Sequence, residues 1–276
     1  MLQTLVATSG LLPEVVKTSD EIALMRNSGR LLASVFEMLD GLDLAGMSTM
    51  QINDLVERYI TVDLAARPAS KGQYGFQFVL NCSINDVVCH GVPDARQFVR
   101  DGDLINLDIT LEKDGFIADS SKTYVVGNAS GAAKRLARIA QGAMWAGIRQ
   151  VRPGAHLGDI GSAIEKHAKK NGCSVVREYC GHGIGRKMHE EPQVLNFGRP
   201  GRGMRLREGM TFTIEPMINQ GTARTSTQKD GWTVVTRDKQ LSAQWEHTIA
   251  VTADGYEVLT LRAEEGAGQG AIQRLP

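Results

Sequence analysis

The segment INLDITLEKDGFIADSS, residues 105–121, carries two aspartates on what its pattern predicts to be the two arms of a β-hairpin. Apolar residues alternate along the first arm, so Asp108 lies on the opposite, polar face. The Lys-Asp-Gly stretch at 113–115 predicts the turn, because glycine accepts the positive φ angle of tight hairpins. Folding about this turn places Asp119 within a residue or so of the position opposite Asp108. Like charges facing each other across two strands are destabilising, so the hairpin needs a compensating positive partner.

The composition is that of a folded protein without a strong overall charge. The chain has 276 residues, 42% of them hydrophobic, and a formal net charge of zero. A chain of this length and apolar content can bury a sizeable core, which argues against global disorder. The balanced charge gives no broad basic surface, so we expect neither nucleic acid nor an anionic membrane as a partner.

The N-terminus and the cysteines favour a cytoplasmic protein. The opening stretch MLQTLVATSGLLPEVV has no basic region, and Gly10 and Pro13 interrupt its apolar run, so we do not expect a secretion signal. No stretch approaches the ~18 apolar residues of a membrane span. The four cysteines contain no C-x-x-C pair and are expected to be reduced and mostly buried. A zinc site using Cys89-His90 and Cys180-x-His182 stays open as an alternative, although its spacing differs from that of structural zinc fingers.

Helical and strand-like patterns follow one another twice along the chain. Two capping boxes, Thr18-x-x-Glu21 and Ser48-x-x-Gln51, precede helical periodicity. Asn171-Gly172 is typical of a helix C-terminus. The patterns predict helices at about 19–41, 49–60, 131–151 and 157–170, strands within 74–126 and 173–262, and a loose tail at 264–276.

An internal repeat explains this order. VRDGDLINLDI (99–109) and LREGMTFTIEP (206–216) match in residue type at a constant offset of 107, and the loops VVCHGVP (87–93) and YCGHGIG (179–185) lie upstream of them. The repeat predicts two half-domains, about 17–126 and 131–262, facing each other about a pseudo-twofold axis in an α+β fold. Each of the two matched strands then places a carboxylate at the interface between the half-domains.

Four carboxylates and one histidine form the candidate site, and each alone has a simpler interpretation as a solvated strand residue or a turn residue. Together they are harder to dismiss, because buried carboxylates need cations or protons. Two divalent ions would balance the four negative charges, and a neutral imidazole would add one nitrogen ligand. Oxygen-rich ligation with one imidazole suits Mn, Fe(II), Co or Zn. The five residues are Asp108, Asp119, His182, Glu215 and Glu246.

Several ordered motifs between about residues 17 and 262 resemble those of the type I methionine aminopeptidases of metallopeptidase family M24. The motifs are NDVVCHGVP, DGDLINLDIT, GFIADSSKTYVVG, YCGHGIGRKMHEEPQVLNFG, GMTFTIEPM, DGWTVVTRD and LSAQWEHTIAVT. The resemblance implies a pita-bread fold, with residues 1–276 as a single catalytic domain and a pair of divalent ions between its duplicated halves. It also implies a monomer that removes the initiator methionine of nascent proteins whose second residue is small.

The resemblance gives each ligand a role. Asp108 would chelate one ion, His182 and Glu215 would hold the other, and Asp119 and Glu246 would bridge both. Glu215 would also take a proton from the attacking water as general base.

The resemblance also implies residues that contact the substrate. His90 would lie near the scissile nitrogen, and His189 would polarise the scissile carbonyl and stabilise the oxyanion. The methionine pocket would be lined by Phe76, Asn81, Met188 and Trp232. The chain departs from the family here, because Asn81 stands where a cysteine is common and YGFQFVLNCSIND lacks the proline usually found after the Gly-aromatic pair.

Two alternatives come from other functions of the same fold. An X-Pro aminopeptidase or prolidase would share the fold and the metal ligands, but such proteins usually carry a separate N-terminal domain, and only 89 residues precede His90 here. A non-catalytic pita-bread protein would bind protein or RNA, but such relatives lack ligands that this chain has. An enzyme acting on nascent chains would work near the ribosome, although no residue demonstrates this.

Overall fold

The computed structural model describes residues 15–266, and its first half begins with two helices that follow the predicted capping boxes. Helix α1 spans Ser19–Asp40, with Thr18 as N-cap and Gly41 as C-cap. Helix α2 spans Thr49–Arg58, capped by Ser48, and continues as the π-helical segment η1, Tyr59–Asp63. In both cases the cap side chain accepts the N3 backbone N–H, which satisfies a donor left free at the helix start.

The second half opens with two further helices at the predicted places. Helix α3 spans Gly131–Ile148, and α4 spans Leu157–Lys170 with Asn171 as C-cap. Helix α3 ends three residues before the predicted limit of 151, because the chain turns there ahead of Pro153. The predicted positions of all four helices are therefore confirmed to within a few residues.

Fifteen strands are described, most of them short and antiparallel. The first half holds β1 (Arg67–Pro68), the 3₁₀ turn η2 (Gln73–Gly75), β2 (Leu80–Ile84), β3 (Val87–Cys89), β4 (Leu104–Lys113) and β5 (Phe116–Val125). The second half holds β6 (Ser174–Val175), β7 (Gly181–Gly183), β8 (Glu190–Val194), β9 (Thr211–Ile214), β10 (Met217–Asn219), β11 (Thr225–Thr227), β12 (Val234–Thr236), β13 (Ser242–Gln244), β14 (His247–Val251) and β15 (Tyr256–Val258). The strand order is β1-β4-β2 with β5 beside β4 in one sheet, and β15-β14-β9-β7-β8, β13-β10-β6 and β11-β12-β3 in the others.

The β4–β5 hairpin corrects one detail of the sequence prediction. Its two turn residues, Asp114 and Gly115, both have positive φ angles, 54° and 80°, as a type I′ turn requires. Asp108 lies opposite Ser121, and Asp119 lies opposite Thr110, so the two aspartates are offset by two residues rather than by about one. An offset of two keeps both side chains on one face of the hairpin, whereas an offset of one would have separated them.

Hydrogen bonds show that the internal repeat is a repeat of structure. The Gly102 N–H donates to the Val126 carbonyl in the first half, and the Gly209 N–H donates to the Val251 carbonyl in the second, each at 2.9 Å. Both glycines adopt positive φ angles. The segments that lead into α2 and α4 also pair alike, with isolated bridges Ser48↔Phe98 and His156↔Arg205. The predicted duplication of the fold is confirmed.

The register of the two hairpins shows which site residues correspond. The pairs Asp108↔Ser121 and Thr110↔Asp119 of the first half match the continuous β9–β10 and β13–β14 pairing of the second half, in which Met217 lies opposite Gln244 and Ile214 opposite His247. Asp108 therefore corresponds to Glu215, Asp119 to Gln244, and Ser121 to Glu246.

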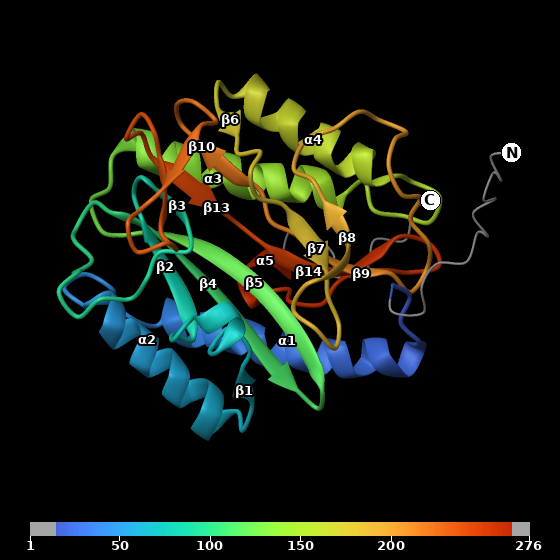
Figure 1. Ribbon diagram of the computed structural model, residues 1–276, viewed down its shortest axis with the longest axis horizontal. Coiled ribbons are helices and arrows are strands. Elements are labelled where there is room, and N and C mark those ends of the chain that lie inside the picture. The colour runs from blue at the N-terminus through green and yellow to red at the C-terminus, as the bar shows by residue number, and fades with distance from the viewer. Residues whose placement is uncertain (1–14, 267–276) are drawn as a thin grey trace, which may run out of the picture.

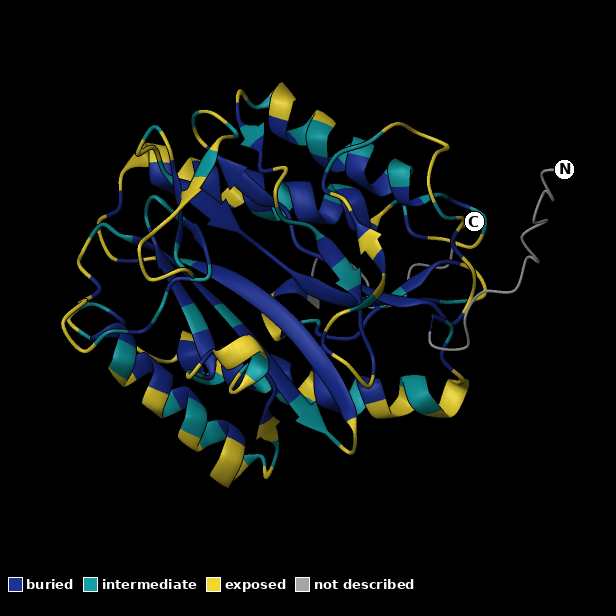
Figure 2. Ribbon diagram, in the orientation of Figure 1, coloured by how far each residue is buried: buried dark blue, intermediate teal, exposed yellow. Residues whose placement is uncertain are grey.

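The strands lie between two helical layers (Figure 1). Helices α1 and α2 cover one side and α3 and α4 the other, with β4, β5, β9 and β14 between them. Each half has its own apolar cluster, one around Phe36, Ile52 and Leu107 and one around Met144, Ile160 and Phe212. The central strands are buried almost throughout (Figure 2), so polar groups on them lie inside the molecule. Within residues 15–266, no helix combines the length and apolar character needed to cross a bilayer.

The C-terminus differs from the expected loose tail. Residues Ala263–Gly266 form the short helix α5, and Glu265 is buried against Arg262 and His247. The start of the tail is thus part of the folded core, because its carboxylates meet buried cationic and imidazole partners. The remainder of the tail, 267–276, and the N-terminal lead, 1–14, lie outside the described residues.

Candidate metal centre

One cavity of about 640 Å³ lies between the two halves and gathers all the metal ligands and substrate-contacting residues that the family resemblance implied. Cys89 of the alternative zinc site does not line it. Its wall also includes Tyr74, Tyr179 and Cys180. The predicted residues around it are Phe76, Asn81, His90, Asp108, Asp119, His182, Met188, His189, Glu215, Trp232 and Glu246.

The five candidate ligands come from five different elements. Asp108 lies on β4 and Asp119 on β5, His182 lies at the centre of β7, Glu215 directly follows β9, and Glu246 directly precedes β14. The two halves meet at this point, since Glu246 forms an antiparallel bridge with Ser121 and donates its N–H to the Ser121 carbonyl at 3.1 Å. The fold therefore brings together carboxylates that are 138 residues apart at the extremes (108 to 246).

The carboxylates are crowded and largely removed from water. Glu246, Asp119 and Glu215 are 2%, 6% and 8% exposed, and Asp108 is half-buried. Burial raises the pKa of Asp108 to about 6, even though a hydrogen bond from Asn81 lowers it. Burial, with the neighbouring charge of Asp108, raises the pKa of Glu215 to about 8. Burial and the neighbouring charges of Asp108 and Glu215 raise the pKa of Asp119 well above its ordinary range. Burial and the charges of Asp119 and Glu215 do the same for Glu246, although Arg262 lowers the pKa of Glu246 in part.

His182 is oriented to offer a lone pair to these carboxylates. Its Nδ1 lies 3.0 Å from the Gly183 carbonyl, which places the ring proton on Nδ1 and leaves Nε2 free. Nε2 lies 3.5 Å from Glu215 Oε1 and 3.8 Å from Asp119 Oδ2. Burial and the nearby His189 lower the pKa of His182 to about 4, so its imidazole is neutral near pH 7.

The glycines around His182 permit this approach. A Cβ on Gly181 would lie 2.4 Å from the Thr213 carbonyl oxygen, and one on Gly183 would lie 2.1 Å from the Glu191 carbonyl oxygen. Both distances are far below van der Waals contact, so only glycine fits at either position.

The arrangement fits divalent cations. Asp119, His182 and Glu246 each offer a ligand atom, and these atoms all lie within 4.8 Å of one another. The Asp119 Oδ1 atom is buried without a hydrogen-bond partner. Among residues 15–266, no lysine or arginine forms an ion pair with any of the four carboxylates; Lys122 instead binds Asp40 and Glu264. Buried carboxylates with a neutral imidazole and no ion-paired lysine or arginine are the donor set of Mn, Fe, Co or Zn sites, and the group contains no cysteine.

Aromatic side chains form an apolar recess beside the carboxylates. Phe76 packs against Trp232 with ring centres 5.1 Å apart and edge-on against Phe78 at 5.6 Å. Met188 is buried and lines the same cavity. Asn81 lies opposite Asp108 in the β2–β4 register and donates to its Oδ2 at 3.3 Å, so this departure from the family acts on a candidate ligand.

Two histidines stand at the cavity edge with aromatic partners that the sequence analysis missed. His90 has a positive φ angle of 55° directly after β3, and its ring packs edge-on against Tyr179 at 5.3 Å. His189 directly precedes β8, its ring lies 4.4 Å from that of His182, and its Nδ1 lies 3.3 Å from the Tyr74 hydroxyl. Tyr179 is the first residue of YCGHGIG and Tyr74 the first of YGFQFVLNCSIND, so both lie in segments that the sequence analysis quoted without singling out the tyrosine.

Comparison with known proteins agrees with this geometry. Residues 23–253 match the model of metallopeptidase family M24. The methionine aminopeptidase of Escherichia coli K12 is 48% identical over 250 residues, which are 91% of this chain and 95% of that protein. The crystal structure of methionine aminopeptidase from Rickettsia prowazekii superposes with a TM-score of 0.87 at 46% identity, covering 89% of this chain and 99% of that one.

A prolidase structure shares the fold at a greater distance. Recombinant prolidase from Thermococcus sibiricus gives a TM-score of 0.72 at 23% identity, and the match covers 90% of this chain and 60% of that one. This similarity supports the pita-bread fold and nothing finer.

The fold and the site together define a metallopeptidase, and the chain belongs to metallopeptidase family M24. Within that family it belongs to the methionine aminopeptidases, from which it differs little in length or architecture.

Proposed function

We propose that the chain removes the N-terminal methionine from new polypeptides whose second residue is small, using a pair of divalent ions held between its halves. The observation that carries this proposal is the convergence of Asp108, Asp119, His182, Glu215 and Glu246 on one cavity with an apolar recess beside them. The family relationship supports the reaction. Four largely buried carboxylates, without an ion-paired lysine or arginine among the described residues, support a pair of divalent ions, whose charge would balance theirs.

Each ligand then has a distinct task. Asp108 would hold one ion, His182 and Glu215 the other, and Asp119 and Glu246 both. When bound, the ions would supply Lewis acidity for the scissile carbonyl and lower the pKa of water. Glu215 would also act as general base, and its carboxylate is oriented by hydrogen bonds from Thr213 to Oε1 at 2.9 Å and from Gln244 to Oε2 at 3.5 Å.

The two edge histidines would orient the substrate. His189 would donate a hydrogen bond to the scissile carbonyl oxygen, and the Tyr74 hydroxyl at its Nδ1 would favour the tautomer that carries the proton on Nε2. His90 would contact the scissile nitrogen, and burial lowers its pKa, so it is neutral and can accept a hydrogen bond. The methionine side chain would occupy the recess formed by Phe76, Asn81, Met188 and Trp232.

We further propose that residues 1–276 act as one catalytic domain, as a monomer in the cytoplasm and near the ribosome, on the N-terminal peptides of nascent proteins. The four free cysteines support a reducing compartment. No nucleic-acid or membrane partner is part of the proposal, in keeping with the zero net charge.

The remaining alternative is hydrolysis of X-Pro bonds, which the fold alone would allow. The apolar recess favours methionine instead, because a thioether chain of this length buries well against aromatic rings. A non-catalytic role is disfavoured because all five ligands lie together.

One experiment tests the proposal. Protein purified without chelator is analysed for bound metal and is then assayed with Met-Ala-Ser and with an X-Pro peptide. We expect bound divalent metal and release of methionine, with loss of activity after chelation and recovery after metal is restored. Cleavage of only the X-Pro peptide would overturn the assignment in favour of a prolidase-like enzyme.

A further inference from the structure

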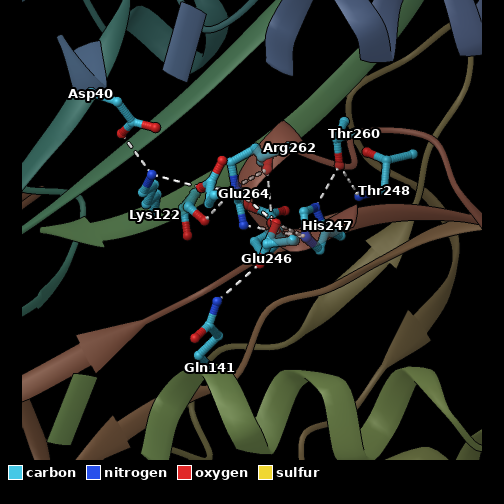
Figure 3. Close-up of polar contacts among 12 residues, drawn as sticks. Asp40, Lys122, Gln141, Glu246, His247, Thr248, Thr260, Arg262 and Glu264 are labelled. Carbon is cyan, nitrogen blue, oxygen red and sulfur yellow. Dashed lines mark hydrogen bonds and ion pairs between the residues drawn. The ribbon is translucent and has the colours of Figure 1, made fainter. Parts of the chain in front are cut away.

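A second polar cluster lies beside Glu246, among residues of β5, β14 and the C-terminal segment that follow or precede the site carboxylates (Figure 3). Its centre is Arg262, which is fully buried and is held from α5 by Glu265, whose Oε2 accepts from Arg262 Nε at 2.9 Å. The guanidinium also lies 5.2 Å from the ring centres of Phe36 and Trp245. The reaction described above uses none of these groups.

Arg262 contacts both strands at the point where the two halves meet. On β5, its Nη1 donates to the Ser120 hydroxyl at 3.0 Å and to the Ser121 carbonyl at 3.3 Å. On β14, its Nη2 lies 3.2 Å from Nε2 of His247. Because side chains alternate along a strand, Ser120 and His247 point to the face opposite that of Asp119 and Glu246.

Direct contacts between β5 and the start of β14 also hold Asp119 and Glu246 in place, including the Glu246 N–H bond to the Ser121 carbonyl at 3.1 Å. The Ser120 hydroxyl donates to the Glu246 carbonyl at 2.7 Å, and the Thr248 hydroxyl donates to the Asp119 carbonyl at 2.8 Å. Arg262 binds the same Ser120 hydroxyl, so its planar guanidinium completes a link from one strand to the other.

The cluster is itself anchored on several sides. His247 Nδ1 contacts the Thr260 hydroxyl at 2.9 Å, and its Nε2 contacts Glu265 at 2.9 Å. Gln141 of α3 donates to Glu265 at 3.0 Å. Figure 3 shows Lys122 between Asp40 of α1 and Glu264 of α5, at 2.6 and 2.7 Å. Arg262 pairs directly with Glu265 at 2.9 Å, and its charge also lowers the pKa of Glu246 against the larger effect of burial. A variant that keeps the charge therefore isolates the geometric contribution.

We propose that Arg262 is a positioning residue that sets the separation of Asp119 and Glu246 by joining β5 and β14 from behind. The proposal rests on the proposed function, since it takes these two carboxylates as shared ligands of both ions. It gives the C-terminal segment 260–265 a role in the metal centre that the sequence did not indicate.

The test uses Mn²⁺ alone as probe and compares the wild type with Arg262→Lys, Arg262→Met and Ile164→Ala. Lysine keeps the charge but lacks the planar fork of donors with which Arg262 contacts both strands. Ile164, fully buried in α4, is a control for loss of packing away from the site. We expect both Arg262 variants to bind Mn²⁺ about tenfold more weakly or worse, and to lower kcat with little change in KM. Ile164→Ala should lower the melting temperature and leave Mn²⁺ affinity within about twofold of wild type.

The visible absorption spectrum of bound Co²⁺ gives a second readout, because it depends on the geometry of the ligands. Arg262 variants with wild-type Mn²⁺ affinity and wild-type Co²⁺ spectra would overturn the proposal and leave the proposed function intact. A wild-type protein that binds no Mn²⁺ would overturn both. If both Arg262 variants fail to fold, Glu265→Gln decides: a smaller loss of Mn²⁺ affinity with an altered Co²⁺ spectrum supports the proposal, and unchanged values refute it.

Discussion

Replacing Glu215 by glutamine should stabilise the metal-free protein while it weakens the metal-loaded one. Glu215 is 8% exposed, and burial near Asp108 raises its pKa from 4.5 to about 8. A carboxyl group whose pKa is raised on folding contributes stability that is complete below the unfolded pKa and is lost as the pH rises through the folded pKa. The window for Glu215 is therefore pH 4.5 to about 8.

The size of the effect follows from this shift. At pH 7 the carboxyl group is ionised in the unfolded chain and mostly protonated in the folded one. The raised pKa therefore lowers the free energy of unfolding by on the order of 3 kcal/mol at pH 7, against less than about 1 kcal/mol at pH 5. Glutamine removes that cost, and its amide oxygen still accepts from Thr213. The Gln244 contact to Oε2 at 3.5 Å is lost, which costs about 1 kcal/mol. The metal-free variant should therefore be more stable by roughly 2 kcal/mol at pH 7.

Urea unfolding in a chelator, followed by circular dichroism at pH 5, 6, 7 and 8, measures this difference. The comparison of variant with wild type cancels the titration of groups elsewhere. Glu165→Gln is the control, because its carboxylate is paired with Lys169 and Arg177 and its removal should not stabilise the fold. With saturating Mn²⁺ the order should reverse, since metal at 100 times Kd adds about 2.7 kcal/mol to the wild type. A metal-free Glu215→Gln protein no more stable than wild type at any of these pH values would refute the reasoning.

Four further outcomes are expected. Asp119→Asn or Glu246→Gln should abolish release of methionine from Met-Ala-Ser and lower the metal bound per chain; full turnover when metal is limiting would contradict this. His90→Ala should slow turnover while its metal content, measured by elemental analysis, stays near wild type; lost metal would reassign His90 to the ligand shell. Binding of Mn²⁺ at pH 7 should release protons, because the free carboxylates have raised pKa values, and calorimetry in buffers of different ionisation enthalpy should show it; identical heats would argue against it. Asn81→Ala should raise the pKa of Asp108 above about 6 and move the midpoint of Mn²⁺ binding to higher pH, and an unchanged midpoint would mean that the Asn81 contact is unimportant.

Local signals in the sequence were sufficient for much of the fold. Capping boxes at Thr18 and Ser48 marked helix starts because they act within four residues. The repeat at an offset of 107 predicted the duplication, since matching residues make matching hydrogen bonds. Of the site, the sequence predicted the residues that gather around the cavity, while their catalytic roles stay predictions.

The remainder depended on packing between distant segments. The exact offset of Asp119 from Asp108 was set by a two-residue turn that pattern alone does not fix. Glu265 looked like part of a loose acidic tail because its partners, Arg262 apart, lie more than fifteen residues away in the chain, at His247 and Gln141. Tyr74 and Tyr179 were missed for the same reason, because each contacts a histidine that is distant in the chain and such a contact produces no periodic pattern in the sequence.

The correspondence of the two halves has a consequence for how the centre is charged. A strictly symmetrical chain, with acids at Gln244 and Ser121 to match Asp119 and Glu246, would gather six carboxylates, more negative charge than two divalent ions can balance. An amide and a hydroxyl at those two positions leave four. The ends of the cluster also differ, with an imidazole beside Glu215 and an amide beside Asp108. In the proposed two-ion centre, divergence of the duplicated halves would thus give both electroneutrality and two unequal binding positions for the ions.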